Sequence, residues 1–212
     1  MVDSISENSQ PGHRRTSREE LDRLLTEITR HPERESEITK IIEDTFNQTK
    51  AVLVLDMSGF SRTTRLYGIV AFLWMIHQTQ LICRPCVEQK QGRVIKADAD
   101  NLLCAFDTVD QAVSAGREIQ ERLSTANLAL PVEKQLYASI GIGYGNILML
   151  GDEDLFGDEV NLACKLGEDI GNEGDILLTS AARAKLTDSS IVTRESTISI
   201  SGLTLTLYRV ES

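Results

Sequence analysis

The chain contains 212 residues, of which 25% are charged and 41% are hydrophobic, and its formal net charge is −10. This composition predicts a soluble globular protein with one domain of ordinary size and an extension. The excess of negative charge argues against nucleic acid or an anionic membrane surface as a partner. The longest purely apolar run, Ile69 to Ile76, is too short to cross a bilayer. Because the N-terminus is polar and the four cysteines have no framework spacing, we expect a cytoplasmic protein.

The first 48 residues are predicted to form a tail and a helical extension. Residues 1–16 are polar and contain Pro, Gly and Ser, which predicts a disordered tail. Residues 17–48 begin with a capping box at Ser17 and carry two apolar stripes at helical spacing, separated by His31-Pro32. Two short helices with one stripe each need a partner surface. Either their own domain or a second copy of the chain could supply it.

The main domain, residues 49–212, is predicted to alternate strands and helices. The expected order of strand, helix, two strands, helix and strand predicts an α/β fold of the α+β sandwich type. In such a fold, helices cover one face of a mainly antiparallel sheet. The expected elements are a strand at 51–55, a helix at about 62–89, two strands within 93–106, a helix at 109–123, a strand at 137–144 ending in a Gly-Tyr-Gly turn, a strand at 147–150, a helix from about 157 to 170, a strand at 175–179, a short helix at 181–186, and a hairpin of 191–201 with 204–210.

One carboxylate, Asp56, follows the first apolar strand directly. It would lie at the carboxyl end of that strand, where α/β folds place their chemistry. Ser58 and Gly59 come next and are expected to leave backbone N–H groups free at a helix start, which is a site for phosphate. Taken alone, this stretch is better explained by an aspartate that caps the next helix.

Two further blocks change that interpretation. The second block is Lys96-Ala97-Asp98-Ala99-Asp100, and the third runs from Asp154 to Lys165. In order and spacing, the three blocks together resemble the class III nucleotidyl cyclases, the adenylyl and guanylyl cyclase family. The resemblance covers about residues 50–210 and implies a ferredoxin-like cyclase-homology domain.

The resemblance implies a metal and phosphate site. Asp56 and Asp100 look like the two carboxylates that hold a pair of divalent ions, and such oxygen ligands suit Mg²⁺ or Mn²⁺. One ion would activate the ribose 3′-hydroxyl and the other would hold the triphosphate. The residues implied to lie against the substrate phosphates are Ser58, Gly59, Phe60 and Ser61.

The resemblance also implies a base-reading pair and two catalytic residues. Lys96 would donate to a ring nitrogen and Asp154 would accept from an exocyclic amine, a pattern that matches adenine and predicts ATP as substrate. Asn161 resembles the asparagine that orients the ribose. Lys165 occupies the position usually filled by an arginine that neutralises charge on the α-phosphate.

Several positions depart from the family pattern. Lys165 cannot make the bidentate phosphate contact of arginine, which predicts slower turnover. Ala99 replaces a glycine, Asp98 adds a carboxylate, and Gly202 follows Ser201, where many relatives carry a lysine. The hairpin before Asp154 is also shorter than usual.

In the family, the metal aspartates and the base-reading pair of one site come from different protomers. The resemblance therefore implies a head-to-tail homodimer, with the N-terminal helices as a possible contact for a regulatory partner. Two alternatives stay open: a cyclase acting on guanine or a pyrimidine base, and a catalytically weak module that binds nucleotide or a partner.

The pair Cys83 and Cys86 forms a CxxC motif on the predicted helix at 62–89. No second pair or suitably spaced histidine completes a zinc site, and no strand immediately precedes the motif as in thioredoxin-like proteins. We therefore expect these cysteines to serve helix packing.

Overall fold

The computed structural model describes residues 16–58, 60–200 and 203–211, and for residues 60–64, 200 and 203 it describes the backbone alone. The tail predicted for residues 1–16 therefore lies outside the described residues, apart from Thr16.

The first half of the main domain is a ferredoxin-like unit, in which two strand–helix–strand segments form one antiparallel sheet. Both β3 and β4 pair antiparallel with β1, and β2 pairs with the outer edge of β3. The elements are β1 (Asn47–Met57), α3 (Phe60–Gln89), β2 (Arg93–Asp98), β3 (Asn101–Phe106), α4 (Val109–Asn127), a short 3₁₀ turn (Val132–Lys134) and β4 (Ala138–Leu150).

The second half extends the same sheet. The full strand order is β2-β3-β1-β4-β6-β8-β7, with β5 paired to the distal end of β4, and only the β4–β6 pairing is parallel. The elements are β5 (Asp154–Phe156), α5 (Asp158–Cys164), a π-helical turn (Lys165–Ile170), β6 (Ile176–Thr179), α6 (Ser180–Lys185), β7 (Thr193–Ile200) and β8 (Leu203–Val210). The predicted α+β sandwich with a mainly antiparallel sheet is confirmed.

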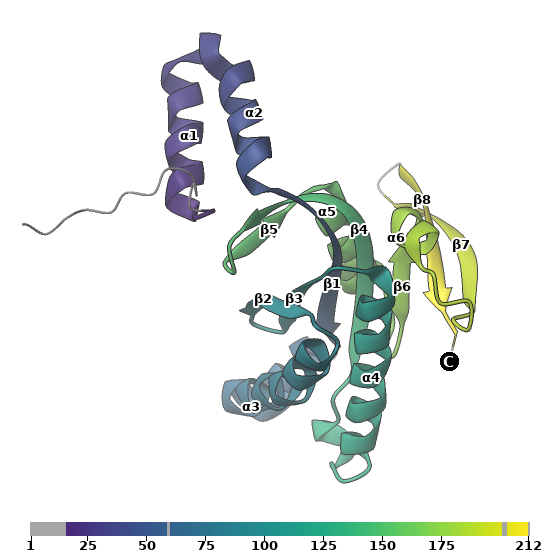
Figure 1. Cartoon of the computed structure of the whole chain (residues 1–212). Helices are drawn as coiled ribbons and strands as arrows, with labels where there is room; N and C mark the ends of the chain where they lie inside the picture. Colours follow the sequence, from purple (N-terminus) through teal and green to yellow (C-terminus); the bar gives the residue numbers. More distant parts are fainter. Residues whose placement is uncertain (1–15, 59, 201–202, 212) are drawn as a thin grey trace, which may run out of the picture.

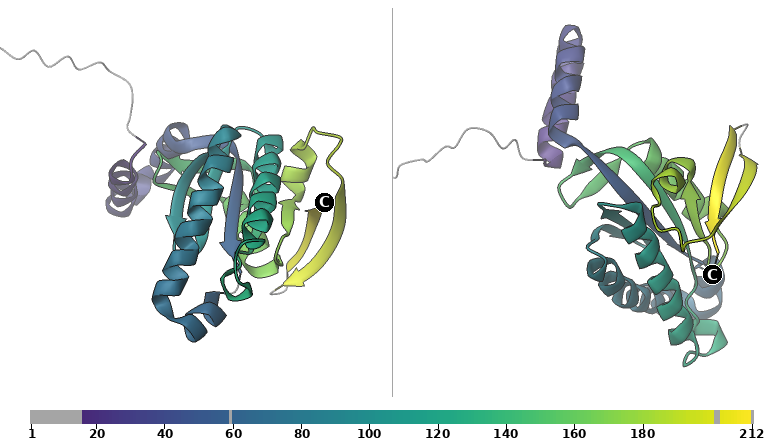
Figure 2. Two further views of the ribbon diagram at one scale, coloured as in Figure 1. Left: turned by 90° about the horizontal axis from the view of Figure 1, so that it is seen from below. Right: turned by 45° about the vertical axis from the view of Figure 1, so that its right-hand side comes forward.

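Helices lie on both faces of this sheet, although unequally. The long helices α3 and α4 lie side by side on one face (Figures 1 and 2). Alternate residues of β1, such as Leu53 and Leu55, share a core cluster with these helices. Val52 and Val54 point to the opposite face and share a cluster with Val160 of α5. The expectation that helices cover one face therefore holds for α3 and α4, and α5 is an addition on the other face.

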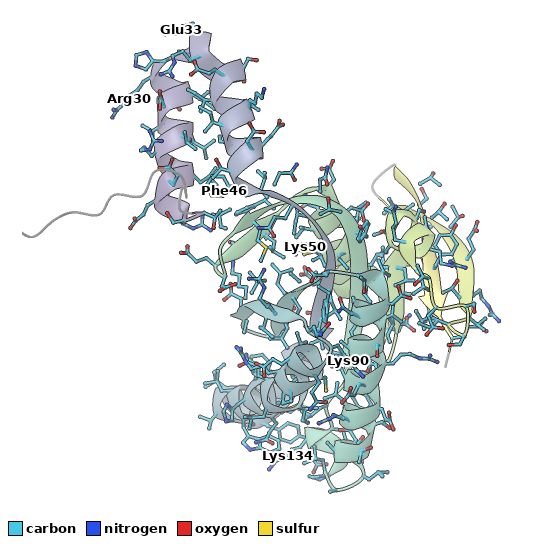
Figure 3. All side chains as sticks on the ribbon, viewed as in Figure 1. Arg30, Glu33, Phe46, Lys50, Lys90 and Lys134 are labelled. Atoms are coloured by element: carbon cyan, nitrogen blue, oxygen red, sulfur yellow. The ribbon has the colours of Figure 1, made fainter. Side chains whose placement is uncertain are left out.

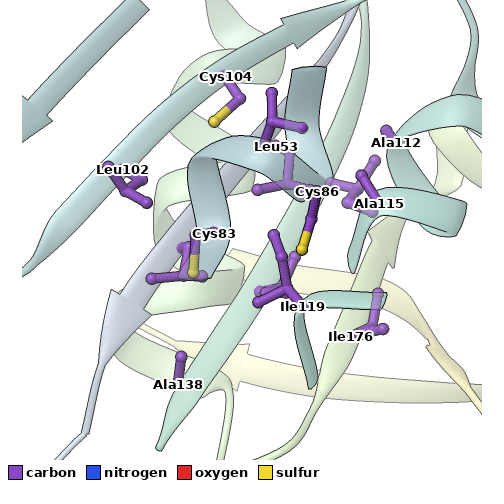
Figure 4. Packing of buried hydrophobic residues seen from close by; sticks show 14 of the residues in the cluster. Leu53, Cys83, Cys86, Leu102, Cys104, Ala112, Ala115, Ile119, Ala138 and Ile176 are labelled. Carbon is purple, nitrogen blue, oxygen red and sulfur yellow. The ribbon is translucent and has the colours of Figure 1, made fainter. Parts of the chain in front are cut away.

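The CxxC motif of α3 lies inside the main core. Cys83 and Cys86 have 0% relative exposure, and Figure 4 shows them among apolar side chains of the sheet and of α4. Burial raises the pKa of both thiols, which keeps them protonated. Within the described residues, no group of three or more His, Cys, Asp or Glu side chains is arranged to hold a metal. The interpretation as packing residues is confirmed.

Strand β4 corrects one prediction. The Gly-Tyr-Gly turn expected at 143–145 is absent, and β4 runs unbroken through it. A Cβ atom at Gly141 would lie 2.0 Å from the carbonyl oxygen of Ala163, and one at Gly143 would lie 2.4 Å from that of Glu159. These glycines therefore serve the close approach of α5 to the strand rather than a turn.

The N-terminal extension forms a helical hairpin. The helices α1 (Arg18–Arg30) and α2 (Glu35–Phe46), joined by a 3₁₀ turn (Pro32–Arg34), pack against each other through their apolar stripes. Leu148 and Leu150 at the end of β4 complete that cluster, so the hairpin packs on its own domain. Figure 3 places Phe46 where the hairpin meets β1 and places Arg30 and Glu33 at its far end.

Candidate functional site

The two predicted metal ligands lie beside each other. Asp56 is near the end of β1 and pairs with Asn101, the first residue of β3, so that Asp100 in the preceding turn is its neighbour. The backbone N–H of Met57 donates to the carbonyl oxygen of Asp100 at 3.2 Å. Ala99 completes this turn with φ +48°, a conformation that explains why glycine suits the position.

Electrostatics at this corner favour a bound cation. Burial is the main cause that raises the pKa of Asp56, to about 7, and the carboxylates of Asp100, Glu168 and Asp169 raise it further. Crowded, partly buried carboxylates repel one another until a cation or a proton neutralises them. The donor set of two adjacent aspartates, all oxygen, fits Mg²⁺ or Mn²⁺.

Glu168 was not predicted from the sequence as part of this corner. It lies in the π-helical turn after α5, and its Oε1 accepts from the side-chain amide of Asn101 at 3.2 Å. Burial first, and then Asp169, raise the pKa of Glu168 as well. Nothing in the sequence pattern links Glu168 to Asp56.

The predicted phosphate loop is only partly described. Gly59 lies outside the described residues, and only the backbone of Phe60 and Ser61 is described, at the start of α3. The N–H of Ser58 donates to the carbonyl oxygen of Tyr137 at 2.9 Å. The expectation that this N–H is free for phosphate is therefore wrong, because the backbone of the segment just before β4 already accepts from it.

The predicted base-reading pair comes together within one chain. Lys96 Nζ lies 3.6 Å from Asp154 Oδ2, although 58 positions separate them in sequence. A shift in the β2–β3 register between Val94 and Lys96 marks a bulge at this point, and bulges re-aim side chains. Asp98 Oδ2 lies 3.7 Å from the same ammonium. The Asp154 side chain is 15% exposed and that of Lys96 is 44% exposed.

Asn161 of α5 and Lys165, the first residue of the π-helical turn, are four residues apart, and the N–H of Lys165 donates to the carbonyl oxygen of Asn161, so both lie near the end of α5. Asn161 is exposed, and Lys165 Nζ lies 3.4 Å from Asp169 Oδ2. Glu159 fixes this helix to the sheet, because its Oε2 accepts from the N–H of Tyr144 at 3.0 Å and from the hydroxyl of Thr179 at 2.7 Å.

Strand pairing places Lys96 and Asp56 on one face of the sheet. Val54 of β1 pairs with Leu103 of β3, which pairs with Lys96 of β2. Paired residues point to the same face, and so do residues two apart in a strand, so Lys96 and Asp56 share the face of Val54. That face is the one on which α5 lies, since Val54 shares a cluster with Val160.

Comparisons with known proteins found relatives in sequence and in structure. No family model matches the chain. It is 30% identical over 129 residues to "Putative adenylate cyclase 3" of Rhizobium meliloti, a match that covers 61% of this chain and 22% of that protein. It is 24% identical over 134 residues to "Serine/threonine-protein kinase pkn2" of Myxococcus xanthus, covering 63% and 16%. The chain therefore spans less than a quarter of the length of these curated relatives.

Solved structures give the fold. The adenylyl cyclase CyaB from P. aeruginosa matches with a TM-score of 0.67 and 21% identity, over 78% of this chain and 96% of that one. The adenylate/guanylate cyclase/hydrolase from Silicibacter pomeroyi has a TM-score of 0.65 and 22% identity, over 77% and 96%. The guanylyl cyclase Cya2 has a TM-score of 0.66 and 19% identity, over 77% and 92%. The chain has the fold of the adenylyl and guanylyl cyclase catalytic domain, and these matches support its resemblance to the class III nucleotidyl cyclases.

Proposed function

We propose that this chain is an adenylyl cyclase that converts ATP to 3′,5′-cyclic AMP and pyrophosphate. The observation that carries the proposal is the 3.6 Å approach of Lys96 to Asp154, with Lys96 on the same sheet face as Asp56, which lies beside Asp100. A cyclase needs a base reader and a cation site for the triphosphate. Four side chains from three separate parts of the sequence would supply the chemistry of both.

Asp56 and Asp100 would hold Mg²⁺ or Mn²⁺, two ions per site. When bound, the ions supply Lewis acidity that lowers the pKa of the ribose 3′-hydroxyl and neutralises the leaving pyrophosphate. Asn161 would orient the ribose so that its 3′-oxygen faces the α-phosphorus. Lys165 would place its ammonium against the α-phosphate, where negative charge grows during attack. Ser58, Gly59, Phe60 and Ser61 would line the phosphates, with Ser58 acting through its hydroxyl because its N–H is already used.

Lys96 and Asp154 would read adenine. The ammonium donates to the ring N1, and the carboxylate accepts from the N6 amine. Guanine presents O6 and N1–H in the reverse order, so each mismatched contact would cost about 1–3 kcal/mol. The substitution pair Lys96→Glu with Asp154→Cys reverses donor and acceptor and should move the preference from ATP towards GTP. The control is Lys90→Glu, a charge reversal on a lysine outside the site that lies 3.3 Å from Glu118.

A second candidate substrate is GTP. Guanylyl cyclases are among the structural matches, including Cya2, so the fold is compatible with either base. The ratio of kcat/KM for ATP to that for GTP distinguishes the two. A ratio below 1 in the unsubstituted protein would mean that Lys96 and Asp154 do not select adenine.

We further propose that the site is completed in a cytoplasmic homodimer. Within the described residues, helix α3 exposes an apolar surface that no other element covers, and a second copy would bury it. The stretch Arg65–Gln89 also has the length and composition of a membrane span, so a bilayer is the competing occupant. The large apolar residues exposed on α3 are Leu66, Tyr67, Ile69, Val70, Leu73, Trp74 and Leu81.

Complementation between inactive variants tests the shared site. Lys96→Ala and Asp56→Ala proteins should each be inactive alone and should regain activity when mixed, because one of the two sites in a heterodimer is then intact. Lys96→Ala mixed with Asp154→Ala is the control, since both defects then fall in the same half of a site. Equal recovery in both mixtures, or none in either after subunit exchange is verified, would contradict the composite site. Pelleting with liposomes would instead identify α3 as a membrane contact.

A further inference from the structure

The N-terminal helical hairpin contacts the base-reading pair through one side chain. Arg18, the first residue of α1, donates from NH2 to Asp154 Oδ2 at 3.0 Å, across 136 positions of sequence. Its guanidinium carbon also lies 5.8 Å from the centre of the Phe156 ring, within the range of a cation–π contact. The Arg18 side chain is 47% exposed, so it remains accessible to solvent beside Asp154.

This contact changes what Asp154 offers to a base. Asp154 Oδ1 accepts from the N–H of Leu155 at 3.0 Å. Asp154 Oδ2 accepts from Arg18 and lies 3.6 Å from Lys96 Nζ. The oxygen that would accept from the adenine amine is therefore already bound to a guanidinium, which weakens it as an acceptor and adds donors at its side.

The contact also depends on the position of the hairpin. Next to it, the carbonyl oxygen of Thr16 approaches Gly151, where a Cβ atom would lie 3.3 Å away. Leu148 and Leu150 hold the apolar stripes of the hairpin a few residues before Asp154. Any movement of the hairpin on the end of β4 would therefore move Arg18 relative to Asp154.

We propose that Arg18 is a third specificity-determining residue of the base site, which lowers the preference for adenine over guanine. Its guanidinium competes with the adenine amine for Asp154 Oδ2 and provides a donor that the O6 atom of guanine can use. The inference rests on the proposed cyclase function of the same site. It adds that the N-terminal extension takes part in base selection.

The test compares Arg18→Ala with Arg23→Ala in the full chain. Arg23 is on the same helix and is 55% exposed, and it pairs only with Glu20 and Glu27 among the described residues. Arg18→Ala should raise the ratio of kcat/KM for ATP to that for GTP, mainly through a lower KM for ATP. The expected increase is about two- to fivefold, because the substitution removes one exposed ion pair. Arg23→Ala should leave the ratio unchanged. An unchanged or lower ratio in Arg18→Ala overturns the inference.

The same substitution in an Asp154→Asn protein shows whether Arg18 acts through Asp154 or affects nucleotide binding in another way. In Asp154→Asn protein, removal of Arg18 should change the ratio of dissociation constants for ATP and GTP, measured by calorimetry, by less than it does in the unsubstituted protein. An equal change in both backgrounds overturns the inference, because the effect would then not pass through Asp154. If the unsubstituted protein binds nucleotides without forming a cyclic product, the proposed reaction fails, and the ratio of dissociation constants still decides the role of Arg18. If it binds neither nucleotide, both proposals fail.

Discussion

The metal-free protein should gain stability when Asp56 is replaced by Asn. Burial, and then the nearby Asp100, Glu168 and Asp169, raise the pKa of Asp56 from 3.8 to about 7. The unfolded chain ionises this carboxyl near its ordinary value, whereas the folded chain keeps it protonated until about pH 7. The unfolded state therefore binds fewer protons in this interval, and the free energy of unfolding falls as the pH rises from 3.8 to about 7.

The size of the effect follows from that interval. At 1.36 kcal/mol per pH unit, the rise from 3.8 to about 7 corresponds to roughly 4 kcal/mol. Asp56 is only partly buried, and solvent screening reduces the expected value to about 2 kcal/mol. Asparagine keeps the size of the side chain and carries no charge. We therefore expect Asp56→Asn to unfold with about 2 kcal/mol more free energy than the unsubstituted protein at pH 8, with little difference at pH 4.

Urea denaturation in EDTA, at one fixed protein concentration, measures this difference. Asp44→Asn, which removes an exposed carboxylate from α2, is the control and should change stability by less than about 0.5 kcal/mol. Equal or lower stability of Asp56→Asn at pH 8 would refute the reasoning, because it would mean that the folded protein stabilises the charged form. Adding Mn²⁺ should then raise the melting temperature of the unsubstituted protein and leave that of Asp56→Asn nearly unchanged.

Three further substitutions test the backbone and the site. Gly141→Ala should destabilise the protein by about 3 kcal/mol or more in urea denaturation, because its Cβ would meet backbone 2.0 Å away, whereas Gly116→Ala on α4 meets ordinary contacts and should be neutral or stabilising. Ala99→Gly should stabilise by about 1 kcal/mol, since φ +48° strains alanine, and no gain in melting temperature would argue against that strain. Lys165→Arg should raise kcat for the cyclase reaction and Lys165→Ala should lower it, and a kcat that is the same in all three proteins would exclude the phosphate role.

Local sequence signals predicted most of the fold. The apolar run before Asp56, the capping box that begins α1 and the helical spacing of α3 and α4 each identified an element that the structure contains. The two short strands within 93–106 were also predicted correctly, as β2 and β3. The resemblance of three sequence blocks to the class III nucleotidyl cyclases then suggested which residues form the site. Composition and periodicity alone could not indicate them.

The misses have one physical cause, which is contact between distant parts of the chain. Gly143 and Gly145 predicted a turn because glycine marks turns locally. In the structure these positions lack a side chain because α5 packs closely on the strand there. The N–H of Ser58 seemed free because its acceptor, the carbonyl oxygen of Tyr137 just before β4, lies 79 positions later in the sequence. Likewise, nothing near Arg18 indicates that it reaches Asp154.

The most direct test of the central claim is a nucleotide panel with product identification by mass. Purified protein is incubated with ATP, GTP, CTP or UTP and Mn²⁺, with Asp56→Asn protein prepared in parallel as the control for contaminating cyclase. The account predicts 3′,5′-cyclic AMP from ATP, with kcat/KM higher for ATP than for the other three, and no product from the control. No cyclic nucleotide from any substrate, or equal product from the Asp56→Asn protein, would contradict it.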